Sequence, residues 1–89
     1  MNRIYCELHL FDLEQKIFIV DPETGNKTQV AIATMEEVPE VICAVADAYQ
    51  IQKVTLTGNS VFGVAISEDI LHYAKLHYSW NNIEVEVLK

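Results

Sequence analysis

Basic residues are scarce in this 89-residue chain, which has six Lys or Arg against thirteen Asp or Glu and a formal net charge of -7. Proteins that bind DNA or RNA directly usually present a basic patch. A strong acidic excess also repels nucleic acids and anionic membranes. The charge balance therefore argues against direct binding of nucleic acid, and it leaves open a protein partner that has a basic surface.

Long apolar runs are also missing. No stretch of about 18 apolar residues occurs, so we expect no membrane span, and residues 1–5 lack the apolar core of a signal peptide. The only two cysteines, Cys6 and Cys43, lie far apart within apolar patterns. They indicate free buried thiols in a cytoplasmic protein, with a disulfide as the alternative.

Glycine and proline are few, with three and two residues, and 51% of the chain is hydrophobic. This composition is typical of a globular protein rather than a disordered one. The length allows one core, so we expect a single domain over residues 1–89.

The first third of the chain predicts three strands. Residues 4–11 alternate between two faces, which indicates a long strand, and the short polar segment 12–15 predicts a turn. Residues 16–20 and 28–33 predict two further strands, separated by the Pro- and Gly-containing loop 21–26. Connections this short favour an antiparallel meander.

A helix is predicted next. Thr34 and Glu37 have the spacing of a capping box, but Pro39 lies too deep for the first helical position if Thr34 is the cap. Either the first turn is irregular or the regular helix begins at Pro39. Apolar residues then recur at intervals of three and four until the helix ends near Gln50.

The segment 53–64 is the unit around which the chain is organised. Residues 53–57 alternate as a buried strand, Gly58-Asn59-Ser60 forms a turn, and one long helix is expected over 60–78. A last strand follows at 83–87. We therefore predict an α/β (α+β) fold with the order βββαβαβ, in which two helices pack on a mixed sheet of about five strands. The strand 53–57 should lie near the centre, parallel to the first strand.

This order, together with the segment 54–63, resembles the central unit of the ribonuclease H-like fold. That family holds divalent metal with acidic residues at strand ends. Carried over by position, the resemblance implies Glu7 in the first strand and Glu37 or Glu40 in the helix, but Thr57-Gly58 stands where the fourth-strand acid would be. Two-metal catalysis would lack part of its clamp.

Two short segments, 54–59 and 81–87, also resemble small phage and prophage proteins of Gram-positive bacteria. This resemblance implies an accessory role in the host cytoplasm and no assigned activity. No cofactor is implied.

Two groups of residues are candidate binding sites. The Gly58-Asn59-Ser60 loop precedes a helix and offers amides to an anion, with a plain turn and helix cap as the alternative. Trp80 and Tyr78, with the acidic residues Glu84 and Glu86, form a candidate interface. The alternative for Trp80 is packing over the helix end.

Metal binding and covalent catalysis find little support. His72 and His77 are five residues apart, which does not place them one turn apart on a helix as in a zinc site. Cys43 lies among apolar residues, so we interpret it as part of the core rather than as a nucleophile.

The leading hypothesis is a non-enzymatic acidic interaction protein, a phage accessory or anti-defence protein that binds a host or phage protein or forms a homodimer. The alternative is a degenerate ribonuclease H-like domain that binds nucleotide or metal.

Overall fold

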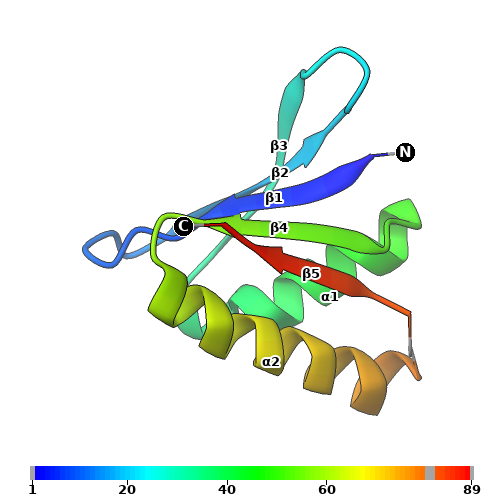
Figure 1. Ribbon diagram of the computed structural model, residues 1–89. Helices are drawn as coiled ribbons and strands as arrows, with labels where there is room; N and C mark the ends of the chain where they lie inside the picture. Colours follow the sequence, from blue (N-terminus) through cyan, green and yellow to red (C-terminus); the bar gives the residue numbers. More distant parts are fainter. Residues whose placement is uncertain (1, 80–81, 89) are drawn as a thin grey trace.

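A computed structural model of the chain describes residues 2–79 and 82–88. The elements follow one another in the predicted order βββαβαβ (Figure 1). They are β1 (Arg3–Glu7), β2 (Gln15–Val20), β3 (Lys27–Ala33), a short 3-10 helix η1 (Met35–Glu37), α1 (Val38–Tyr49), β4 (Lys53–Thr57), α2 (Ser60–Tyr78) and β5 (Glu84–Val87).

The strands form one mixed sheet in the order β3-β2-β1-β4-β5. The first three strands are antiparallel neighbours, whereas β4 lies parallel to both β1 and β5. The register sets Cys6 beside Ile17 on one side and Leu56 on the other, so β1 is the central strand and β4 adjoins it. This confirms the predicted fold class and the parallel pairing of 53–57 with the first strand.

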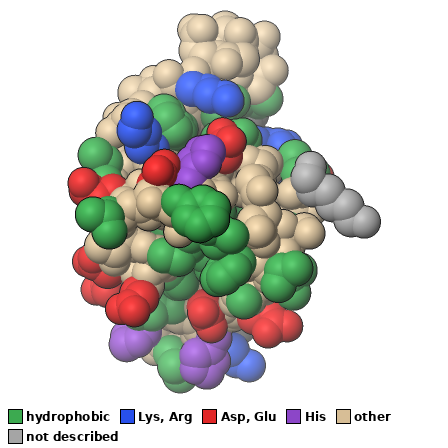
Figure 2. Space-filling model, turned by 90° about the vertical axis from the view of Figure 1, so that its left-hand side faces the viewer, with side chains coloured by type: hydrophobic (Ala, Val, Ile, Leu, Met, Phe, Trp, Pro, Cys, Tyr) green, Lys and Arg blue, Asp and Glu red, His purple; other side chains and the backbone are tan. Residues whose placement is uncertain are grey.

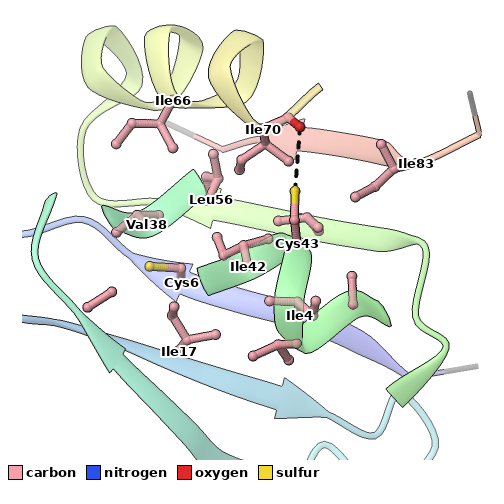
Figure 3. Packing of buried hydrophobic residues seen from close by; sticks show 14 of the residues in the cluster. Ile4, Cys6, Ile17, Val38, Ile42, Cys43, Leu56, Ile66, Ile70 and Ile83 are labelled. Carbon is pink, nitrogen blue, oxygen red and sulfur yellow. Dashed lines mark hydrogen bonds between the residues drawn. The ribbon is translucent and has the colours of Figure 1, made fainter. Parts of the chain in front are cut away.

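Both helices cover the same face of the sheet (Figure 1). The core lies between them and the sheet, and side chains from β1, β2, β4 and both helices meet in it (Figure 3). Its largest fully buried residues include Ile4, Ile17, Ile42, Leu56 and Ile70. No described helix lies on the opposite face, which we call the open face of the sheet.

The first strand is shorter than its sequence pattern predicted. The alternation of residues 4–11 suggested one strand, but β1 ends at Glu7. Leu8 still donates its amide to the carbonyl of Thr57 at 2.8 Å, and the chain then leaves the sheet. The alternation of apolar residues continues into the loop, although the neighbouring strand β4 has ended. The pattern alone therefore overestimates the length of β1.

A β-bulge changes which residues of β3 face the core. Ile17 pairs with Ala31 and Phe18 with Gln29, so that Val30 is the extra residue. Because a bulge shifts the alternation by one residue, Ala33 is buried and Ile32 is 48% exposed. The uniform alternation predicted over 28–33 is therefore interrupted at this point.

The first helix begins with an irregular turn, one of the two predicted alternatives. η1 precedes α1, which starts at Val38, one residue before Pro39. The Thr34 hydroxyl donates to the Glu37 carboxylate at 2.7 Å, and neither side chain caps a backbone amide. The predicted capping box, in which each side chain bonds a backbone amide, is therefore not formed; the two side chains bond each other instead. Gln50 ends α1 in the left-handed conformation.

The second helix runs from Ser60 to Tyr78, as predicted. The Asn59 side chain accepts a hydrogen bond from the amide of Phe62 at 3.1 Å and so caps the helix. Its buried positions are Gly63, Ile66, Ile70 and Ala74, one narrow stripe along the helix.

Candidate functional site

The carboxyl ends of β1 and β4 meet at one end of the molecule, and the segments that follow them lie together. Leu8, just after β1, bonds to Thr57 at the end of β4. A Cβ placed on Gly58 would come 2.5 Å from the carbonyl oxygen of Leu8. The loop between β1 and β2 therefore lies against the turn that leads into α2.

The loop between β1 and β2 is held in place by one buried side chain. Gln15, fully buried, accepts from the amide of His9 at 2.7 Å and donates to the carbonyl oxygens of His9 and Asp12 at 2.9 and 3.1 Å. The Asp12 amide adds a bond to the carbonyl oxygen of His9 at 3.2 Å. These bonds fix the backbone of the loop from inside the protein.

The fixed loop presents apolar side chains to solvent. Phe11 is 99% exposed and Leu13 is 89% exposed. Single exposed apolar residues are common on protein surfaces, but these two are joined at the same end by three further exposed hydrophobic residues. We call the five residues the apolar end: Leu10, Phe11, Leu13, Val61 and Phe62.

Acidic residues surround the apolar end. Figure 2 looks onto this side of the molecule and shows hydrophobic side chains gathered at its centre, with Asp and Glu side chains around them. Because Gln15 pairs with Ala33, the segment after β3 starts at the same end. The acidic residues that the topology places here are Glu7, Asp12, Glu14, Glu36 and Glu37.

A hollow of about 190 Å³ lies beside the loop. Its lining combines carboxylates with the ring of Phe18 and with Lys16. The Glu7 carboxylate lies 3.4 Å from Nε2 of His9 at its edge. The acidic members of the lining are Glu7, Asp12 and Glu14.

Two of the three residues in the predicted anion-binding loop have structural roles. Gly58 has φ +97° and has no room for a side chain beside Leu8, and Asn59 uses its side chain to cap α2. The third residue, Ser60, is the first of the helix. Anion binding at this loop stays a prediction.

The residues of the predicted interface do not gather on one surface. Tyr78 packs against the core from the helical layer, whereas Glu84 and Glu86 lie on β5 with their side chains on the open face. Glu86 forms an ion pair with Arg3 at 3.5 Å. Trp80 falls outside the described residues.

The acids carried over from the ribonuclease H-like resemblance have separate neighbours. Glu7 lies beside His9, and Glu37 bonds to Thr34. Partial burial raises the pKa of the Tyr73 hydroxyl, and the nearby Glu40 carboxylate raises it further. In residues 2–79 and 82–88, no three His, Cys, Asp or Glu residues are grouped so that they could hold a metal ion.

Both cysteines are free and buried, which confirms the predicted thiols over a disulfide. Burial raises the pKa of Cys6 to about 12, with a further contribution from the Glu7 carboxylate, and raises that of Cys43 to about 11. Cys43 donates its thiol proton to the carbonyl oxygen of Ile70 at 3.6 Å (Figure 3). Such thiols are protonated at neutral pH, and the thiolate is the nucleophilic form.

The sequence interpretation missed Phe11 and Leu13. The alternation of residues 4–11 places Phe11 in the first strand, and the short polar segment 12–15 places Leu13 in a turn. The available signal was the occurrence of two large apolar residues beside Asp12 and Glu14, in a segment that has to reverse direction.

No protein-family model matches the chain, and no curated protein matches it. Solved structures do. Pelota from Archaeoglobus fulgidus matches with a TM-score of 0.59 and 12% identity, over 99% of this chain and 26% of that one. The fowlpox virus Holliday junction resolvase matches with a TM-score of 0.47 and 18% identity, over 99% of this chain and 60% of that one. A Ppx/GppA family member from Aquifex aeolicus matches with a TM-score of 0.40 and 13% identity, over 99% of this chain and 35% of that one.

The chain thus spans about a quarter of Pelota and less than two thirds of the other two proteins. At such identities the likeness concerns the fold alone. It is a mixed α/β fold, and a fold of this kind hosts many functions. Within the part of the chain that the structure describes, neither helix has the length and apolar character of a membrane span.

Proposed function

We propose that the protein is a non-enzymatic interaction protein that binds a partner protein through the apolar end. The observation that carries this proposal is the near-complete exposure of Phe11 and Leu13 on a loop that Gln15 holds from inside. Large apolar side chains that enter a partner's pocket supply much of the binding energy of an interface. A loop that is already ordered loses little entropy on binding, which favours affinity.

The charge around the apolar end defines the chemistry of the partner. The acidic residues there favour a partner in which an apolar groove is bordered by Lys and Arg. The hollow has three carboxylates, from Glu7, Asp12 and Glu14, against the one ammonium of Lys16, so it is suited to one further basic side chain that stacks on the ring of Phe18. The partner is therefore a basic protein surface, such as the groove of a protein that itself binds nucleic acid.

A phage accessory or anti-defence role is the more specific form of this proposal. It is supported by the resemblance of residues 54–59 and 81–87 to small phage and prophage proteins. In that form the partner is a host or phage protein in the cytoplasm.

Capture of partners on immobilised protein tests the proposal. Wild-type protein should retain a specific protein from the native cell, and Phe11→Ser with Leu13→Ser should lose it. Leu76→Ser is the matched control, because Leu76 is 64% exposed near the other end of α2, and it should retain the partner. Equal capture by the double variant and the wild type would contradict the proposed site.

The alternative is a nuclease-like or nucleotide-binding domain. Thr57 stands in place of the fourth-strand acid, and its hydroxyl lies 3.1 Å from that of Tyr5 in a hydrogen bond. Incubation with magnesium or manganese and labelled nucleic acid decides between the two. Cleavage by the wild type that Glu7→Gln abolishes would replace the interaction proposal.

A further inference from the structure

The open face of the sheet carries most of the basic residues of this acidic chain. Side chains alternate along each strand, so the residues between the core positions of β1, β2, β4 and β5 point to this face. Four of the six basic residues lie here although the chain is strongly acidic. They are Arg3, Lys16, Lys27 and Lys53.

The two edge strands of the sheet carry opposite charges on this face. Lys27 lies on β3, at one edge, whereas Glu84 and Glu86 lie on β5, at the other. All three residues are exposed. The Lys27 ammonium lies 4.1 Å from the centroid of the Tyr5 ring, which keeps its charge over the open face. We call β3 the basic edge of the open face and β5 its acidic edge; Arg3, Lys16 and Lys53 lie on the strands between them.

The centre of the open face is partly apolar. The rings of Tyr5 and Phe18 lie on neighbouring strands with their centroids 6.5 Å apart. Thr55, which lies beside them on β4, is only 4% exposed, because the guanidinium of Arg3 reaches over it, donating to its hydroxyl at 3.1 Å. Two aromatic rings and a covered threonine therefore separate the basic edge from the acidic one.

Glu84 is the carboxylate of the acidic edge that is left for a partner. The guanidinium of Arg3 pairs with Glu86. Glu84 has no ion pair among the described residues. Lys53 is its neighbour in the register but forms no ion pair with it, so the Glu84 carboxylate is available to a cation of a second chain.

Lys27 and Glu84 lie at the same level along the strands. Lys27 pairs with Val20 and Val20 with Arg3, while Glu84 pairs with Lys53 on the other side. The pairing of residues 4 and 54 sets Arg3 level with Lys53. Four strand spacings of about 4.8 Å separate β3 from β5, roughly 19 Å, so the two charges cannot meet within one chain.

A second copy of the chain can pair them. If two open faces meet about a two-fold axis that runs along the strands, β3 of each copy lies over β5 of the other, and each Lys27 faces a Glu84. A two-fold axis across the strands would instead place β5 over β5 and bring the carboxylates of one β5 onto those of the other. Like charges that face each other disfavour the second arrangement. In the first arrangement Arg3 of each copy lies at the axis on the middle strand, and its guanidinium is already paired with Glu86 of its own chain.

We propose that the open face of the sheet docks a second copy of the chain about a two-fold axis parallel to the strands, with Lys27 of each copy over Glu84 of the other. Tyr5 and Phe18 form the partly apolar centre of this isologous interface. A second copy fits better than an anionic polymer, because a polymer that bound at Lys27 would also meet Glu84 and Glu86 across the same face. This inference rests on other residues than Phe11 and Leu13 of the apolar end, although the Phe18 ring borders both sites.

Sedimentation of two charge-reversal variants tests the pairing. Wild-type protein should dimerise as its concentration rises. Lys27→Glu and Glu84→Lys should each weaken dimerisation by about tenfold or more, because every dimer would contain two like-charge contacts. An equimolar mixture of the two variants should recover wild-type association. In a mixed dimer the introduced carboxylate at position 27 faces the introduced ammonium at position 84, and the native Lys27 of one variant faces the native Glu84 of the other.

Controls separate this result from unfolding and from the apolar end. Lys75→Glu makes the same charge change on α2 and should leave the dimer intact, as should Phe11→Ser with Leu13→Ser. A wild type that stays monomeric at the highest concentration would overturn the inference. So would unchanged dimerisation of either reversal variant, a mixture that fails to associate, or loss of the dimer in the apolar-end variant.

Discussion

Gly63 of α2 lies directly against Val87 of β5. A Cβ atom added to Gly63 would come 2.6 Å from Cγ1 of Val87, well inside van der Waals contact. From the sequence alone, this glycine only weakens the helix, by about 1 kcal/mol relative to alanine. In the structure Gly63 has a packing role, because the absence of a side chain allows α2 to lie close to the edge strand β5.

Gly63→Ala should therefore lower the free energy of unfolding instead of raising it. Overpacking of a filled site costs about 1–3 kcal/mol. Over most of this range the cost is larger than the gain of about 1 kcal/mol in helix propensity. Urea melts measure the change. Val87→Ala should relieve the clash, so the double variant should be more stable than the sum of the single effects; strictly additive effects would contradict the close contact.

Gln15→Ala should release the loop that carries Phe11 and Leu13. The substitution removes three hydrogen bonds to the loop backbone and should cost about 1–3 kcal/mol of stability. The amide of His9 loses its acceptor, so hydrogen exchange at this amide should become much faster. Lys16→Ala, a change at the next and exposed position, should leave the exchange slow. Equal exchange in wild type and Gln15→Ala would mean that the loop is held in another way.

The fold could be predicted from the sequence where local pattern and tertiary packing agree. Asn59 at the cap and the apolar stripe from Ile66 to Ala74 define α2 without help from other elements. The bulge at Val30 could not be predicted, because it depends on how β3 pairs with β2. It is the reason that Ile32 faces solvent.

The candidate site was harder to predict than the fold. The alternating pattern predicts a strand that includes Phe11. The charged residues Asp12 and Glu14 predict an ordinary polar turn after it. What places Phe11 in solvent is the inward side chain of Gln15, a contact between the loop and a buried position. The sequence pattern gave no signal that this glutamine is buried.

Alkaline pH should destabilise the protein through Cys6. Burial raises the pKa of Cys6 from 9.0 to about 12, so above about pH 9 the unfolded chain releases a proton that the folded protein keeps. The contribution to stability is complete below about pH 9 and falls as pH rises, by at most about 1.4 kcal/mol per pH unit. Urea melts of wild type and Cys6→Ala at about pH 8 and about pH 10 should show the stability difference between them shrinking. A constant difference would argue against a buried protonated thiol.

Leu56 should be one of the residues on which the stability of the whole domain depends. It is fully buried on β4, between the central strand and the edge strand β5, and it faces the helices. Leu56→Ala removes these contacts and leaves a cavity, which costs about 2–5 kcal/mol at well-packed sites, a large part of the roughly 5–15 kcal/mol expected for a domain. Glu68→Ala, on the exposed side of α2, should cost under about 0.5 kcal/mol. Urea melts of both variants at low protein concentration compare the two losses without a contribution from association. Similar losses would mean that β4 is not the buried inner strand between β1 and β5 that the structure shows.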